Sequence, residues 1–166
     1  DNLNKIEESI LVLNEVLELD PYSEVAWHQL GLVLLKKEYQ KEALSAFDFA
    51  IISDDTFTGA YIEKGKLLES MGRINEAIDN YEIALNTNDP SAFVFQCIGR
   101  CHETLGNNTL AIKFYLKAIR LEPCNEKSWI TLIEYCITLG QYKKAKGYFK
   151  RALEVNTESV NLSLIH

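Results

Sequence analysis

The feature that most constrains the fold is a register of 34 residues that recurs along the chain without a slip. A large aromatic residue opens each copy, and a small residue follows four positions later in all copies except the last, which has Ile133 there. The positions that keep this register are Trp27, Tyr61, Phe95 and Trp129; Gly31, Gly65 and Gly99; Ala43, Ala77, Ala111 and Ala145; Phe47, Tyr81, Tyr115 and Phe149; and Ala50, Ala84, Ala118 and Ala152. A fixed period of this length is typical of stacked repeat units.

Each copy is predicted to be a pair of antiparallel α-helices. The spacings i, i+3, i+4 and i+7 place one set of residues on one helical face: Trp27, Leu30, Gly31 and Leu34. Gly72, Gly106 and Gly140 lie between the two segments of their copies, where glycine ends a helix at low cost. A glycine within a helix costs about 1 kcal/mol relative to alanine. We therefore expect Gly31 to lie where the partner helix leaves no room for a side chain.

The pattern W-x2-L-G…A-x3-F…P, with proline at Pro21 and Pro123, resembles the tetratricopeptide repeat (TPR) over nearly the whole chain. The best copies are Trp27-x2-Leu30-Gly31…Ala43-x3-Phe47 and Trp129-x2-Leu132…Ala145-x3-Phe149. The resemblance implies an all-α right-handed superhelix, a solenoid of antiparallel helix pairs. The departures from the pattern are Lys64 in place of Leu, Ile133 in place of Gly, and His102 and Cys136 where Tyr is common.

The register also predicts the boundaries of the units. Four full repeats are expected at 24–57, 58–91, 92–125 and 126–159. Residues 1–23 are expected to be the second helix of a preceding repeat, and residues 160–166 the start of a further one. Neither end shows the polar capping helix that solenoids need for solubility, so we expect the sequence to be a piece of a longer array.

Composition narrows the class of protein. A hydrophobic content of 47% with 25% charged residues is typical of a folded chain. A net charge of -7 without a basic run argues against nucleic-acid binding, and no apolar run reaches the roughly 18–20 residues that span a membrane. We expect Cys97, Cys101, Cys124 and Cys136 to be reduced thiols, which favours the cytoplasm. The abundance of Ile, Asn and Lys is compatible with a bacterial source.

The sequence contains few candidate residues for a metal-binding or catalytic site. The nearest approach to a metal motif is Cys97-x3-Cys101-His102, but His102 points about 100° away from Cys101 around the helix, and we expect the thiols to fill helix contacts. His28 and His166 stand outside any nucleophile motif, and no glycine-rich phosphate loop occurs. We expect no catalytic activity, no metal and no cofactor.

In TPR arrays the first helix of each repeat lines a concave groove in which peptides dock, and the resemblance implies the same here. The groove positions are the second, fifth, ninth and twelfth of each repeat, which lie on the helix face away from Trp27, Leu30 and Leu34. The predicted peptide-groove residues are His28, Leu32 and Leu35; Ile62, Lys66 and Glu69; Phe93, Gln96, Arg100 and Glu103; and Lys127, Ile130, Glu134 and Ile137. Val25 and Gly59 complete the set.

This lining leaves alternatives open. Lys66 and Arg100 are successive rungs that could hold a carboxylate, or they could form surface ion pairs with Glu69 and Glu103 three residues on. The apolar members either mark an interaction site or contact a neighbouring helix or a second chain; they are Leu32, Leu35, Ile62, Phe93, Ile130 and Ile137.

One binding mode of TPR domains is the chaperone-tail clamp, in which Lys, Asn and Arg side chains hold a C-terminal carboxylate. The corresponding positions in the two possible frames are His28, Leu32, Glu63, Phe93 and Cys97, and Ile62, Lys66, Cys97, Lys127 and Thr131. Neither set matches, so we expect no clamp.

The favoured function is a non-catalytic scaffold that holds a protein or peptide segment in the groove. The alternatives are a structural or oligomerisation arm that self-associates through open ends, and a regulatory arm of a larger protein whose catalytic domain lies outside this sequence.

Overall fold

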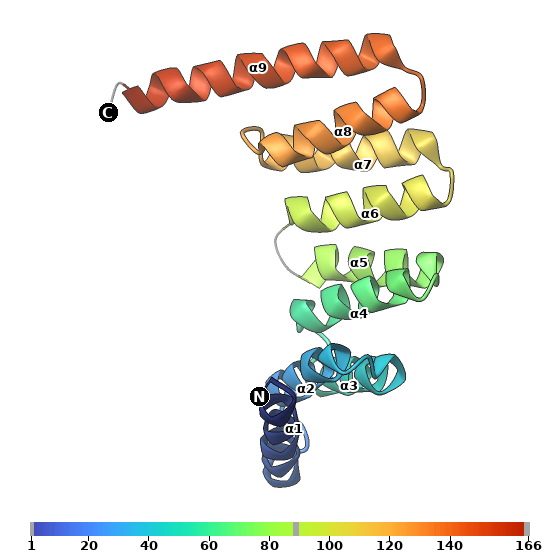
Figure 1. Cartoon of the computed structure of the whole chain (residues 1–166), viewed down its shortest axis with the longest axis vertical. Helices are drawn as coiled ribbons and strands as arrows, with labels where there is room; N and C mark the ends of the chain where they lie inside the picture. Colours follow the sequence, from blue (N-terminus) through green and yellow to red (C-terminus); the bar gives the residue numbers. More distant parts are fainter. Residues whose placement is uncertain (1, 88–89, 165–166) are drawn as a thin grey trace. The chain divides into compact units, whose positions relative to one another are not determined.

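The computed structural model describes residues 2–87 and 90–164, and all regular secondary structure in these ranges is α-helical (Figure 1). The helices are α1 (Asn2–Leu19), α2 (Glu24–Lys36), α3 (Gln40–Ser53), α4 (Thr58–Ser70), α5 (Ile74–Thr87), α6 (Ala92–Thr104), α7 (Asn108–Leu121), α8 (Glu126–Thr138) and α9 (Tyr142–Leu164). They form two compact units that divide between residues 89 and 90, and each unit is described by itself.

The helices pair as the 34-residue period predicts. The first unit contains α1 and the pairs α2/α3 and α4/α5, and the second contains the pairs α6/α7 and α8/α9. Each first helix has 13 residues. The second helices have 14 residues, except α9, which has 23 and continues as one helix through the expected boundary at 159. The all-α stack of antiparallel helix pairs is therefore confirmed.

Local sequence explains where these helices begin and end. The side chains of Ser23 and Asn125 accept hydrogen bonds from backbone amides in the first turns of α2 and α8. Gly72, Gly106 and Gly140 have φ of 76°, 74° and 69°, the left-handed conformation that ends a helix without steric cost in glycine. In the first repeat the same position is Glu38, which has φ of 62°.

In the first and fourth repeats, a tryptophan of the first helix is hydrogen-bonded to the loop that precedes it. The indole Nε1 of Trp27 donates to the carbonyl of Pro21 at 2.9 Å. In the fourth repeat, Trp129 donates in the same way to Pro123 at 2.8 Å. The proline and tryptophan of the repeat pattern therefore act together to hold the turn that precedes the first helix.

The helical glycines lie against an aromatic ring from the second helix of their own repeat. A Cβ built on Gly65 would lie 2.6 Å from Tyr81, and one on Gly99 would lie 2.7 Å from Tyr115, distances that real Cβ atoms do not show. Gly31 lies equally close to the ring of Phe47. The expected lack of room is confirmed, and its cause is a buried ring rather than a close backbone.

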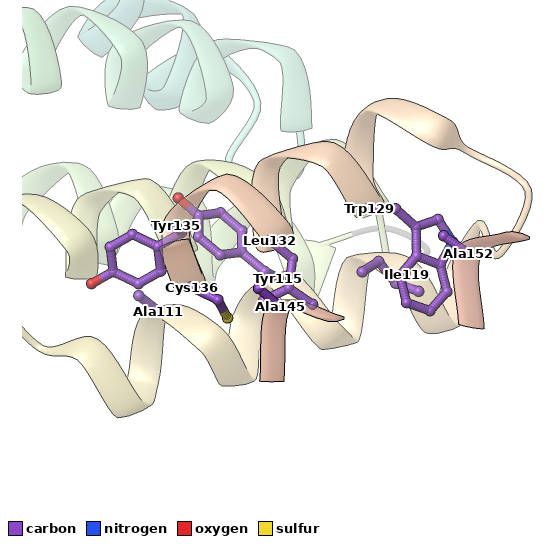
Figure 2. Close-up of a cluster of buried hydrophobic side chains, with 9 residues drawn as sticks. All are labelled: Ala111, Tyr115, Ile119, Trp129, Leu132, Tyr135, Cys136, Ala145 and Ala152. Atoms are coloured by element: carbon purple, nitrogen blue, oxygen red, sulfur yellow. The ribbon is translucent and has the colours of Figure 1, made fainter. Parts of the chain in front are cut away.

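Apolar cores lie between the helices of each unit. In the second unit, Figure 2 shows one cluster of buried side chains from α7, α8 and α9, in which Tyr115 and Tyr135 lie edge to face with centroids 5.9 Å apart. Cys136 belongs to this cluster, and Cys97 and Cys101 are also fully buried. The four cysteines are free thiols, of which only Cys124 is exposed.

Candidate functional site

The predicted groove residues fall into two sets, one in each unit. In the first unit they lie on α2 and α4, and in the second unit they lie on α6 and α8. Each set is a face shared by two neighbouring first helices. We call the first the α2/α4 face and the second the α6/α8 face.

His28 is the partly buried centre of the α2/α4 face. Its ring lies edge to face with Phe57 at 5.3 Å between centroids and is tilted against Phe47 at 5.9 Å. Burial lowers the pKa of this imidazole below its usual value, nearby Lys66 lowers it further, and Glu63 opposes both. Within the described residues Nε2 has no hydrogen-bond partner, which favours the neutral ring at neutral pH.

Leu32 and Leu35 contribute to the core of the first unit. Both are half-buried and pack against a cluster that includes Phe47 of α3 and Leu67 of α4. Contact with neighbouring helices is thus one role of these leucines. Ile62 on α4 is also half-buried.

Tyrosine hydroxyls are hydrogen-bond partners of the two carboxylates at the twelfth position. Glu69 accepts a hydrogen bond from the hydroxyl of Tyr81 at 3.1 Å, and Glu103 accepts one from Tyr115 at 2.6 Å. Lys66 forms its 2.7 Å ion pair with Glu63, three residues before it. The carboxylates at the twelfth position are therefore held by a tyrosine hydroxyl from the second helix of their own repeat.

This contact follows a rule that runs through the four repeats. Where the buried aromatic position is Tyr, in the second and third repeats, the twelfth position is Glu. Where the aromatic is Phe, in the first and fourth repeats, the twelfth position is Leu35 or Ile137. A buried hydroxyl needs an acceptor whereas a phenyl ring does not, which accounts for the pairing.

The α6/α8 face exposes more apolar surface than the α2/α4 face. Phe93, Ile130 and Ile137 are 47%, 51% and 48% exposed. Arg100, Glu103, Lys127 and Glu134 are the exposed charged members of the set. The face therefore combines aromatic and aliphatic anchors with charges of both signs.

Gln96 joins the two first helices of the second unit. Its amide donates to the hydroxyl of Ser128 at 2.5 Å, which joins α6 to α8, and Ser128 is almost fully buried. A guanidinium nitrogen of Arg100 lies 3.6 Å from the sulfur of Cys97, both on α6. Sequence reasoning missed Ser128, although it occupies the third position of its repeat, where Ala26, Ala60 and Val94 of the other repeats are also buried. The Tyr–Glu rule was likewise present in the register.

Neither a metal-binding cluster nor a helix that could span a membrane occurs among the described residues. No cluster of three or more His, Cys, Asp or Glu side chains that could bind a metal ion occurs in residues 2–87 and 90–164. In the same part of the chain, every helix is too short or too polar to cross a membrane.

The chain is similar to several curated repeat proteins. Human tetratricopeptide repeat protein 7A is 26% identical over 136 residues, which is 82% of this chain and 16% of that protein. Human tetratricopeptide repeat protein 33 is 25% identical over 122 residues, 74% of this chain and 47% of that protein. Anaphase-promoting complex subunit 3 of Schizosaccharomyces pombe is 26% identical over 150 residues, 88% of this chain and 22% of that protein. The chain thus spans less than half of the length of each.

Solved structures share the fold. The crystal structure of MamA matches with a TM-score of 0.82 at 22% identity, covering 96% of this chain and 94% of that one. YrrB, described as a TPR protein with an unusual peptide-binding site, matches with a TM-score of 0.72 at 19% identity, covering 87% and 75%.

The family model of the tetratricopeptide repeat matches residues 58–89, 97–124 and 128–159, more than half of the chain and in register with the second, third and fourth repeats. The chain belongs to the tetratricopeptide repeat family.

Proposed function

We propose that this chain is a non-catalytic scaffold that binds a peptide or protein segment on the faces of its first helices, chiefly the α6/α8 face. One observation carries the proposal: Phe93 on α6, and Ile130 and Ile137 on α8, each leave about half of their surface exposed. Apolar side chains gathered on such a face are typical of protein-interaction sites.

The charges on the face support a role in orienting the ligand. Arg100 and Lys127 can bind carboxylates of a peptide, while Glu134 can bind its basic groups. Such exposed pairs contribute less to affinity than to specificity and to the rate of association. The apolar residues would therefore supply most of the binding free energy.

The α2/α4 face supports a smaller share of the binding. Leu32 and Leu35 already pack against their own core, and the ammonium group of Lys66 already pairs with Glu63. Fewer side chains remain there to be buried by a ligand. We infer that truncations on the α6/α8 face reduce affinity more than truncations on the α2/α4 face.

A displayed library of random peptides would test the proposal without knowledge of the natural partner. Peptides selected on the wild-type protein are then measured by fluorescence anisotropy against Phe93→Ala/Ile130→Ala. We expect this variant to bind at least tenfold more weakly, because it loses both anchors.

The matched control is Leu110→Ala/Leu121→Ala, which removes two apolar side chains from the second helix α7 of the same unit, where they are 39% and 45% exposed. Circular dichroism checks that both variants keep their helices. Equal affinity of the two variants for every selected peptide would contradict the α6/α8 face as the binding site.

Two further parts of the interpretation remain predictions. The free cysteines support a reducing compartment such as the cytoplasm, and the composition is compatible with a bacterial source. A structural arm that self-associates is the second candidate function. It is favoured by the opposite net charges of the two units, since residues 1–89 contain 7 Lys or Arg and 18 Asp or Glu, and residues 90–166 contain 10 and 6.

A further inference from the structure

The outward surface of the second helices is acidic in the first unit and basic in the second. We define the outer face as positions 18, 19, 22, 25, 26 and 29 of each repeat, which lie opposite the buried alanine–aromatic–alanine positions 20, 24 and 27. On α3 and α5 its charged residues give a net charge of -4; they are Lys41, Glu42, Asp48, Glu76, Asp79 and Glu82. On α7 and α9 they give +6; they are Lys113, Lys117, Arg120, Lys143, Lys144, Lys150, Arg151 and Glu154.

Exposure of the outer face follows from the repeat architecture. The positions of Lys143, Lys144 and Gly147 are solvent-exposed in all four repeats. Their exposed counterparts are Lys41, Glu42 and Ser45; Asn75, Glu76 and Asp79; and Thr109, Leu110 and Lys113. The second unit therefore differs from the first in the sign of its outer charge and not in the openness of these positions.

The bases on α9 surround a glycine. Gly147 lies within the helix, and the residues four and three positions before and after it, which are its neighbours on the helix surface, are Lys143, Lys144, Lys150 and Arg151. A Cβ built on Gly147 would meet no atom within 4 Å, so no contact among the described residues requires a glycine, which lowers helix propensity. The missing side chain leaves the helix backbone open between four cations, where a ligand chain can approach closely.

Two bases of the outer face lie over aromatic rings. The guanidinium carbon of Arg151 lies 5.8 Å from the ring centroid of Trp129 on α8. At the equivalent position of α7, Nζ of Lys117 lies 4.8 Å from the ring centroid of Phe114 and 5.4 Å from that of Phe95. The rings attract these cations and restrict where their side chains lie. No ion pair among the described residues neutralises a base of the outer face of α7 or α9.

We propose that the outer face of the second unit binds an acidic peptide segment of a partner protein. The backbone of the peptide crosses Gly147, and its carboxylates pair with the four surrounding bases. From Lys143 to Arg151 these bases extend over about 12 Å, at a rise of about 1.5 Å per residue. About four residues of an extended peptide cover that length. The three bases on the outer face of α7 add positive charge at equivalent positions of the preceding repeat.

The composition of the outer face favours a peptide over a nucleic acid. Proteins that bind single strands stack the bases on aromatic side chains, and the outer positions of α7 and α9 include no aromatic residue. Their uncharged members are Thr109, Leu110, Leu116 and Gly147, of which the leucines suit the aliphatic side chains of a peptide. The net charge of -7 on the whole chain also opposes a long polyanion.

Fluorescence anisotropy with a labelled octaglutamate peptide tests the inference at low ionic strength, where exposed charges are least screened. We expect Lys143→Glu/Arg151→Glu to bind this peptide at least tenfold more weakly than the wild type. The rival probe is an oligothymidylate with eight phosphates, which should bind the wild type at least tenfold more weakly than octaglutamate does. Tighter binding of the oligothymidylate would overturn the proposal in favour of a nucleic acid, and no measurable binding of octaglutamate by the wild type would also overturn it.

Two further variants separate docking across Gly147 from a general effect of charge. Lys36→Glu/Lys146→Glu makes the same change in charge at exposed lysines outside the outer face, since Lys146 lines a hollow against α8. This control should bind octaglutamate within twofold of the wild type. Gly147→Leu changes no charge and should weaken binding at least fivefold, because leucine is a good helix former whose side chain fills the space between the four bases.

Circular dichroism checks that every variant keeps its helices. A lysine control that weakens as much as Lys143→Glu/Arg151→Glu, or a Gly147→Leu variant that binds like the wild type, would overturn the proposal. The inference goes beyond the proposed function, because the outer face belongs to the second helices whereas the α6/α8 face belongs to the first helices. The selected peptides measured on the α6/α8 face and octaglutamate on the outer face therefore report on the two proposals separately.

Discussion

The first three repeats and the fourth treat the same aromatic position in opposite ways. Phe47 and Tyr81 are 0% exposed and Tyr115 is 2% exposed, whereas Phe149 is 55% exposed. The backbone pattern of paired helices is the same in all four. The difference coincides with Ile133, which replaces the glycine that receives the ring in the other three.

This comparison teaches where the repeat obtains its packing energy. Full burial of an aromatic side chain contributes about 1.5–3 kcal/mol relative to exposure. The glycine opposite it costs about 1 kcal/mol of helix propensity. The pair is therefore favourable as a unit. Phe149 lacks the glycine, and among the described residues it also lacks a following helix such as α4, which packs against Phe47 through Leu67.

The largest expected difference in the free energy of unfolding is between truncating the buried ring of Phe47 and truncating the exposed ring of Phe149. Phe47→Ala should reduce the free energy of unfolding by about 3–5 kcal/mol, because it leaves a cavity in a closed core. Phe149→Ala should cost less than about 1 kcal/mol, because more than half of that side chain is already in water. Urea unfolding followed by circular dichroism measures both, and equal losses would show that exposure does not separate the two rings.

The next effect tests the glycine. Gly65→Ala introduces a Cβ 2.6 Å from the buried ring of Tyr81, so the ring must move, and we expect a loss of about 1–3 kcal/mol. A Cβ built on Gly147 of α9 has no neighbouring atom within 4 Å. Gly147→Ala should therefore stabilise the protein by about 0.5–1 kcal/mol through helix propensity. If both substitutions stabilise, the ring does not need the glycine.

A smaller effect separates tyrosine repeats from phenylalanine repeats. Burial, and then its hydrogen bond to Glu103, raises the pKa of Tyr115, so the phenol remains protonated and donates over the whole physiological range. Tyr115→Phe should cost about 1 kcal/mol. Adding Glu103→Leu, which reproduces the Phe47 and Leu35 pair of the first repeat, should recover part of that loss. Additive losses in a double-mutant cycle would argue against coupling between the two positions.

The sequence predicted the fold well because the 34-residue register repeats one physical problem four times. The helical glycines, the aromatic rings and the glycines with positive φ serve the same contacts in three of the four copies, so their spacing stands out along the sequence. The same periodicity placed the groove residues on one side of their helices. The register could also have shown that Glu69 and Glu103 occur in the repeats whose aromatic residue is Tyr rather than Phe, since both positions recur every 34 residues.

The details of the faces were harder to predict because they depend on contacts between repeats. The bond from Gln96 to Ser128 joins the side chains of two successive first helices. Leu32 and Leu35 pack against a cluster that includes Leu67 of the following repeat. Fractional exposure is a property of the packed helices, so sequence spacing alone could not divide the apolar groove positions into buried and exposed ones.

The smallest expected effect concerns His28, which the buried ring of Phe47 helps to shield from water. Burial holds the pKa of His28 below 6.5, near which the imidazole of an unfolded chain titrates. Between the two pKa values the unfolded state binds more protons, so the free energy of unfolding falls as the pH drops below about 6.5. His28→Leu should flatten this dependence between pH 7.5 and 5.5 in urea titrations.

The same measurement connects His28 to the comparison between repeats. In the Phe47→Ala background the imidazole gains access to water, so its pKa should return toward the ordinary value and the pH dependence should shrink. Phe149→Ala should leave the dependence unchanged, because the fourth repeat has Ile130 at the position of His28. A pH dependence that Phe47→Ala does not alter would mean that Phe57 and the rest of the α2/α4 face desolvate the imidazole without the buried ring.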